Sequence, residues 1–132
     1  METMKWTDFL KVGHSRIDRD HQRLVGLINE LGEAMTSGQG KEACGKVLEE
    51  LITYTKTHFS MEEELMARHQ FQGAADHKRE HARLVQEVVD FQRKYEADAL
   101  TLSVPLLHFL MEWLSQHILK SDKALAKGLP KE

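Results

Sequence analysis

Cysteine and proline are scarce in this sequence, and glycine is not enriched. Cys44 is the only cysteine among 132 residues, so no intramolecular disulfide can form. Two prolines and eight glycines leave few positions for turns, which favours long helices over many short elements. The lone thiol fits a reducing compartment and the first residues show no signal-peptide pattern, so we expect a cytoplasmic protein.

Long apolar runs and a surplus of positive charge are also missing. The longest apolar run near the C-terminus, residues 104–110, contains His108 and is far too short to cross a bilayer. The net charge is −3, and lysines and arginines are scattered rather than gathered into a stripe. We therefore expect no stable membrane insertion and no nucleic-acid partner. The length suits one domain, which we expect to span residues 1–132.

Four segments of the chain carry apolar residues at the spacing of an amphipathic helix. The first runs in alternating steps of four and three: Ile17, His21, Leu24, Ile28, Leu31 and Met35. The pattern predicts helices over residues 17–36, 41–66, 74–96 and 104–124. Residues 1–16 lack this period but include several apolar side chains that could pack down as an ordered arm, namely Trp6, Phe9, Leu10 and Val12.

The connections between these segments predict the topology. Pro105 suits the first turn of the last helix, with Ser103 available as its N-cap. Short connections between four helices favour antiparallel neighbours. The sequence therefore predicts an all-α fold, an up-down-up-down antiparallel four-helix bundle with an ordered N-terminal arm.

Seven potential metal ligands lie on or beside the apolar stripes of these helices. They are His21, His58, Glu62, His77, His81, His117 and Asp122. Side chains four residues apart on a helix lie one turn apart on the same face, so His58/Glu62 and His77/His81 are local chelates. In an antiparallel bundle all seven ligands come to the same pole. His117 and Asp122 are five apart and about 140° out of phase, so a local π-type widening is needed to bring them together.

Five imidazoles and two carboxylates in an apolar interior require partners, and metal coordination satisfies all of them together. A nitrogen and oxygen shell without thiolate suits iron, manganese or zinc, and seven ligands are too many for one zinc ion. Two metal ions bridged by both carboxylates and one solvent-derived oxygen would leave one coordination position open.

The order and spacing of these motifs resemble the hemerythrin family, and especially its single-domain bacterial branch. The resemblance covers nearly the whole chain and rests on Trp6, Val12-Gly13, Ile17-Asp18-x-x-His21, His58-Phe59-x-x-Glu62-Glu63, His77-x-x-x-His81 and Trp113-Leu114-x-x-His117-Ile118-x-x-x-Asp122. It implies two non-haem iron ions with an oxo or hydroxo bridge and reversible binding of dioxygen.

Carried over position by position, the family pattern assigns each ligand. It places His77, His81 and His117 on one iron and His21 and His58 on the other, with Glu62 and Asp122 bridging. The iron with two histidines would hold the open site. An apolar oxygen pocket is implied at Phe59, Trp113, Leu114 and Ile118. The chain departs from the usual pattern at Asp20, His14 and Gln72, none of which is a ligand in the pattern.

Three classes of function are compatible with a helical bundle of this size. The first is a non-enzymatic oxygen-binding protein for storage, delivery or sensing, where delivery would require an oxygen-consuming recipient protein. The second is an enzyme, a di-iron oxidase or peroxidase or one that detoxifies nitric oxide or iron. The Glu-x-x-His pairs typical of ferritin-like enzymes are absent from the sequence. A phosphotransfer bundle, the third class, would leave four stripe histidines unexplained.

Overall fold

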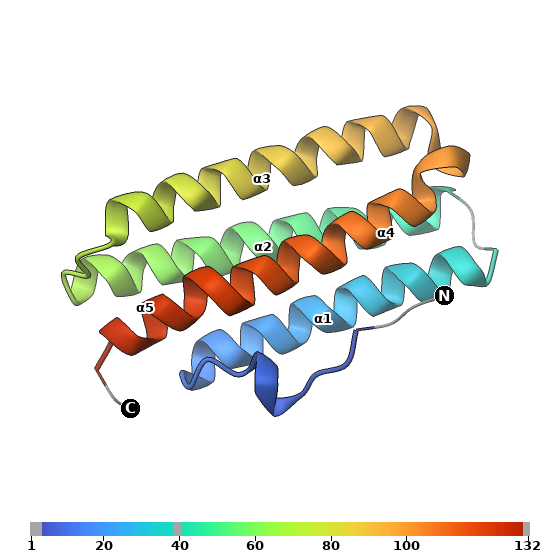
Figure 1. Ribbon diagram of the computed structural model, residues 1–132. Helices are drawn as coiled ribbons and strands as arrows, with labels where there is room; N and C mark the ends of the chain where they lie inside the picture. Colours follow the sequence, from blue (N-terminus) through green and yellow to red (C-terminus); the bar gives the residue numbers. More distant parts are fainter. Residues whose placement is uncertain (1–3, 39–40, 131–132) are drawn as a thin grey trace.

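The computed structural model describes residues 4–38 and 41–130, without the side chains of 99–102, 118 and 119. Four long helices run back and forth along one axis (Figure 1): α1 Ser15–Thr36, α2 Lys41–Arg68, α3 Ala74–Ala97 and α4 Ala99–Gln116. The last continues through a π-helical segment, η2 His117–Asp122, into α5 Lys123–Gly128, and a short 3-10 turn, η1 Asp8–Leu10, lies in the N-terminal arm. The predicted all-α, antiparallel four-helix bundle is confirmed.

The bundle has two poles that differ in what they contain. Each long helix packs against the next in sequence, and α4 closes the bundle against α1. The start of α1, the connection from α2 to α3, and α5 lie together at one end (Figure 1). The end of α1, the start of α2 and the connection from α3 to α4 lie at the other end. The predicted ligands therefore fall near one pole, because each lies near the end of its helix that reaches it.

Helix α1 begins two residues earlier than its apolar stripe predicts. His14 is its N-cap, and the Nδ1 atom of His14 accepts a long hydrogen bond from the backbone N–H of Ile17 at 3.5 Å. Asp18 accepts from the backbone N–H of Val12 at 2.7 Å and of Gly13 at 3.3 Å, which fixes the turn before the helix. His14 thus has a local role in starting α1.

The N-terminal arm packs along the bundle as predicted, with one exception. Leu10 is buried, and Trp6 and Val12 pack against the core. Phe9 is 69% exposed, so the expectation that it packs inward is wrong. Its ring instead lies 4.8 Å from the ammonium group of Lys123, a distance that permits a cation–π contact.

The ends of the other helices differ from the predicted bounds. α2 continues to Arg68, and the last helical stretch reaches Gly128 rather than residue 124. The prediction for Pro105 was wrong: α4 begins at Ala99, so Pro105 lies inside the helix and Ser103 is not its N-cap. The prediction relied on the preference of proline for a first turn. The φ angle of proline is also compatible with the interior of a helix, although one backbone hydrogen bond is lost there and the helix is often kinked.

Two apolar clusters fill the bundle, with the polar ligands between them. The larger runs along most of the bundle length, and the smaller contains Ile17, Met61, Leu65, Met66, Leu125 and Leu129. Along α1, His21 lies between Ile17 of the smaller cluster and Leu24 of the larger one. Both faces of the polar layer are therefore closed by hydrocarbon.

The stability of the fold should depend on the larger cluster. Leu110 is completely buried, whereas Val104 on the same helix is 48% exposed. We expect Leu110→Ala to lower the free energy of unfolding by roughly 2–5 kcal/mol, because it removes buried methyl groups and leaves a cavity. Val104→Ala should change it by about 0.5 kcal/mol or less. Urea denaturation followed by circular dichroism measures both, and equal effects would place Leu110 outside the core.

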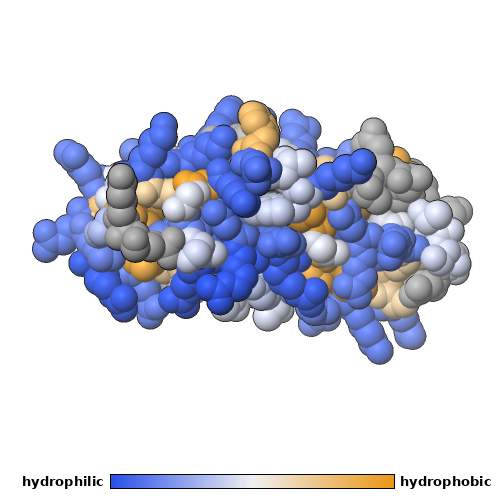
Figure 2. Space-filling view, turned by 90° about the horizontal axis from the view of Figure 1, so that it is seen from below, coloured by the Kyte–Doolittle hydropathy of each residue, from blue (hydrophilic) through white to orange (hydrophobic). Residues whose placement is uncertain are grey.

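The face of the bundle that is seen in Figure 2 is mostly hydrophilic. Hydrophobic atoms are visible on it only in small, separate patches. Among the described residues, none of the helices combines the length and apolar character needed to cross a membrane. The apolar side chains of the bundle are used mainly for packing between the helices.

Candidate metal centre

Three of the long helices and the π-helical continuation of the fourth contribute to a buried cluster of histidines and carboxylates. α1 supplies His21, α2 supplies His58 and Glu62, and α3 supplies His77 and His81. The π-helical segment η2 begins at His117 and ends at Asp122. All seven residues are between 0% and 7% exposed. The structure thus brings together every residue that the sequence nominated as a ligand.

The π-helix places the last two of these residues. The Nε2 atom of His117 and the Oδ2 atom of Asp122 are 2.9 Å apart, although five residues separate them. An α-helix would send the two side chains about 140° apart, and the wider turn removes this divergence. The π-type widening predicted from the spacing is confirmed. π-Turns of this kind occur frequently at functional sites.

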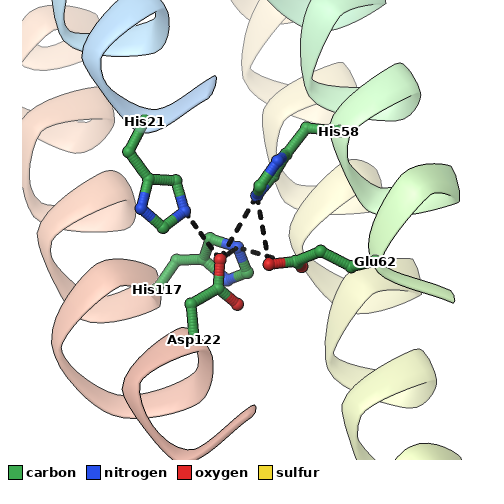
Figure 3. Close-up of side chains that lie close together, drawn as sticks. All are labelled: His21, His58, Glu62, His117 and Asp122. Carbon is green, nitrogen blue, oxygen red and sulfur yellow. Dashed lines mark hydrogen bonds and ion pairs between the residues drawn. The ribbon is translucent and has the colours of Figure 1, made fainter. Parts of the chain in front are cut away.

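Asp122 lies where side chains from four elements of the bundle meet, and Figure 3 shows the contacts with three of them. Its Oδ2 atom lies 2.6 Å from Nε2 of His21 and 3.2 Å from Nε2 of His58, in addition to the contact with His117. Its Oδ1 atom lies 3.3 Å from Nε2 of His77. One carboxylate therefore contacts histidines from α1, α2, α3 and η2.

Glu62 has a similar position on the side of α3. Its Oε1 atom lies 2.9 Å from Nε2 of His81 and 3.3 Å from Nε2 of His77. Its Oε2 atom lies 3.3 Å from Nε2 of His58 on its own helix. All these contacts use the Nε2 atoms of the imidazoles, so the five rings point the same nitrogen toward the two carboxylates.

Two of the histidines are held by further acidic residues through Nδ1, the ring nitrogen that does not contact Glu62 or Asp122. The Nδ1 atom of His58 donates to Oδ2 of Asp20 at 2.9 Å, and Nδ1 of His81 donates to Oε2 of Glu63 at 2.9 Å. A proton held on Nδ1 leaves the Nε2 lone pair available for a metal ion. Tyr54 in turn donates to Oδ1 of Asp20 at 3.0 Å.

Sequence reasoning did not find these supporting contacts. It noted Asp20 as a departure from the family pattern and Glu63 as part of that pattern, and it assigned a partner to neither. The available signal was position: Glu63 and Asp20 each directly adjoin a predicted ligand on their own helix. Each contacts a histidine on the neighbouring helix, so the register of the packed helices determines the partner.

The cluster contains polar atoms that its own contacts do not satisfy. Among the described residues, Nε2 and Nδ1 of His117, Nδ1 of His21, Oε2 of Glu62 and Oδ1 of Asp122 are buried without a hydrogen bond. Some of these atoms are within ion-pair distance of a partner but are poorly aligned with it, as for His117 and Asp122. Burying polar atoms without partners costs free energy. Imidazole nitrogens and carboxylate oxygens that face one another without partners suit a bound cation.

The donor atoms form two overlapping sets. One contains His21, His58, Glu62, His117 and Asp122, and the other contains Glu62, His77, His81 and Asp122. Within each set, the atoms lie within 4.8 Å of one another. Both carboxylates belong to both sets, as bridging ligands of a metal pair would. Nitrogen and oxygen donors without thiolate fit iron.

The grouping of His117 differs from that in the family pattern. It falls with His21 and His58, whereas the pattern places it on the iron with His77 and His81. Ring centroids show that His117 lies between the two groups: it is 5.7 Å from His21, His58 and His81 and 6.2 Å from His77. Its position is therefore compatible with either ion.

Neighbouring charges shift the pKa values of several residues in the cluster. Burial would raise the pKa of Asp122, but the neighbouring imidazoles, first among them His117, hold it well below its usual range. Burial would lower the pKa of His58, but Glu62, Asp122 and Asp20 together raise it well above its usual value. The contacts of His77 with Asp122 and Glu62 overcome its burial and raise the pKa of His77 to about 9. Without a metal, protons on these histidines balance the two carboxylates.

Of the residues predicted for an oxygen pocket, Phe59 contacts the cluster, while Trp113 and Leu114 are buried on α4 within about one turn of His117. Phe59 stacks on His81 with ring centroids 3.9 Å apart and planes at 7°. Trp113 is 5% exposed and donates from its indole Nε1 to the backbone oxygen of Leu84 at 3.2 Å, while Leu114 is completely buried. The side chain of Ile118, the fourth residue predicted for an oxygen pocket, lies outside the described part of the structure.

Comparison with known proteins agrees with this geometry. The model of the hemerythrin HHE cation binding domain matches residues 12–128. The chain belongs to the hemerythrin family. A bacteriohemerythrin from Stenotrophomonas maltophilia is 36% identical over 126 residues, covering 96% of this chain and 81% of that relative. A bacteriohemerythrin from Methylococcus capsulatus is 34% identical over 126 residues, covering 93% and 94% of the two chains.

The fold is also that of a solved hemerythrin. A crystal structure of wild-type hemerythrin superposes with a TM-score of 0.83 at 31% sequence identity, covering 97% of this chain and 98% of that one. The resemblance inferred from the spaced motifs is confirmed. Membership of the hemerythrin family supports binding of non-haem iron and of oxygen, and the buried histidine and carboxylate cluster is a site suited to the metal.

Proposed function

We propose that this chain binds dioxygen reversibly at a non-haem di-iron centre, and that it serves in oxygen storage, delivery or sensing rather than as an enzyme. The observation that carries the proposal is the pair of overlapping donor sets that share Glu62 and Asp122. A single ion would not need both sets, and two independent ions would not share both carboxylates.

The proposed ligand roles follow the family pattern. His77, His81 and His117 would hold one iron, His21 and His58 would hold the other, and Glu62 and Asp122 would serve both ions. When bound, a pair of ferrous ions can supply the two electrons required for reversible reduction of dioxygen.

The protein around the metal site favours release of unchanged oxygen. The walls at Phe59, Trp113 and Leu114 are buried and apolar, which limits the water that could protonate reduced oxygen. Among the described residues, three acidic groups next to ligand residues act as hydrogen-bond acceptors: Asp20 accepts from His58, Glu63 accepts from His81, and Glu80 accepts from the hydroxyl group of Ser121. These contacts argue against a proton donor for cleavage of the oxygen–oxygen bond and hence against an oxidase or peroxidase.

Reversibility can be tested with visible and near-ultraviolet spectra. The iron-loaded protein, reduced under anaerobic conditions, should develop an absorption band on exposure to air and lose it on purging with argon. Repeated cycles should return the same two spectra. A permanently oxidised spectrum after the first exposure, or steady consumption of oxygen with a reductant, would favour the enzymatic alternative. A protein that remains colourless after loading would contradict the iron site itself.

A further inference from the structure

Three side chains form a continuous hydrogen-bonded line from the flank of the bundle to the metal cluster. Tyr54 is half-buried and donates from its hydroxyl group to Oδ1 of Asp20 at 3.0 Å. The other oxygen of Asp20 accepts from Nδ1 of His58 at 2.9 Å. The side chain of Asp20 is 19% exposed and that of His58 is completely buried. Both oxygens of Asp20 are therefore engaged, each by a residue on α2.

The line connects two helices at the level of the metal cluster. Asp20 is on α1, directly before His21, whereas Tyr54 and His58 are one turn apart on α2. With one oxygen held by Tyr54, the Asp20 carboxylate has little freedom to rotate away from His58. The position of the His58 ring thus depends on a residue from the helix that also supplies His21.

The two histidines on this side of the cluster are supported differently. His58 has the Asp20 carboxylate behind it, but Nδ1 of His21 has no hydrogen-bond partner among the described residues. A carboxylate that accepts the Nδ1 proton of a ligand imidazole fixes its tautomer and orientation and makes Nε2 a stronger donor. Such support is thus present for only one of the two histidines on this side.

We propose that Asp20, held in place by Tyr54, is a positioning residue that fixes His58 and strengthens its bond to a metal ion on the side of the cluster with His21. This inference rests on the proposed di-iron function. It adds to that function a dependence of one ion on a carboxylate that is not itself a ligand. The other ion should depend on Asp20 much less.

A cobalt(II) titration in competition with a chelator tests this dependence, because it reports the affinity of each ion without oxygen chemistry. Asp20→Ala should weaken binding of one ion by roughly 10- to 100-fold, the range usual for loss of such a supporting group, and leave the other within a few-fold. Asp20→Asn should recover much of the loss, because its amide oxygen can still accept from His58. Tyr54→Phe should give a smaller loss at the same ion.

A second measurement separates this role from general stabilisation. In the zinc-loaded, nitrogen-15-labelled protein, the Nδ1 proton of His58 should give a resonance protected from exchange with water in the wild type. That resonance should disappear in Asp20→Ala and persist in Asp90→Asn, which removes an exposed carboxylate elsewhere on the bundle. Loss of helix stability alone would not single out this proton.

The outcomes distinguish this inference from the proposed function. If the wild type does not bind two cobalt ions, the di-iron proposal itself fails. If it binds two and Asp20→Ala binds both with wild-type affinity, the positioning role is wrong. An equal loss at both ions in Asp20→Ala and Asp20→Asn would also overturn it. If Asp20→Ala does not fold, Asp20→Asn and Tyr54→Phe decide the question through the same titration and the same resonance.

Discussion

Glu62→Ala should purify with almost no bound iron. Glu62 belongs to both donor sets and contacts His58, His77 and His81, so its loss removes a ligand from each proposed ion. Loss of a group that only supports a ligand costs roughly 10- to 100-fold in metal affinity, and loss of a shared ligand should cost more. Iron content measured by atomic absorption on the freshly purified protein is the readout.

Glu64→Ala is the matched control for this variant. Glu64 lies on the same helix two residues further on and is exposed, so its loss should leave the iron content unchanged. His77→Ala should also abolish retention of the iron pair, because it removes a ligand from one ion and a contact from each carboxylate. A full complement of iron in Glu62→Ala would show that this carboxylate is not shared.

Much of the site could be predicted because helical periodicity and antiparallel topology together fix which residues reach a common pole. His21, His77 and His81 occupy core positions of their stripes, so their burial followed from the stripe itself. The spacing of His117 and Asp122 contradicted a regular helix, and that contradiction predicted the π-turn. In both cases the relevant geometry lies within one helix or in the order of the helices.

The features that escaped prediction depend on contacts between helices or on competing local preferences. The partners of Asp20 and Glu63 lie on neighbouring helices, and sequence spacing does not report the register of one helix against another. Pro105 has two compatible positions in a helix, and packing rather than propensity decides between them. Phe9 is apolar but lies on the outside of the arm, where a nearby lysine contacts it.

Iron affinity should increase with pH up to about 9. The acidic neighbours of His58 and His77 overcome the effect of burial, raising the pKa of His58 well above its usual value and the pKa of His77 to about 9. Without metal, both rings therefore hold protons at neutral pH, and a metal ion must displace them. The affinity should rise by about tenfold per pH unit for each proton that the metal displaces. Once the pH passes the pKa of His77, the metal-free protein no longer carries that proton, so the slope of affinity against pH should fall. Chelator competition at several pH values measures the slope, and His108→Ala, which removes an exposed histidine, should reproduce it.

The stability of the metal-free protein should follow the opposite trend over the same range. A histidine whose pKa is raised by folding contributes stability that is fully present below its unfolded value of 6.5 and is lost as the pH rises through about 9. Asp122 and Glu62 have lowered pKa values, so their contribution is lost only in acid. Urea unfolding of the metal-free protein should therefore become easier from pH 6.5 to 9 while metal binding becomes tighter. If both quantities are flat across this range, protons on His58 and His77 do not compete with the metal. If both trends appear, Glu62 and Asp122 stabilise the protonated histidines in the metal-free protein and the metal ions in the loaded protein.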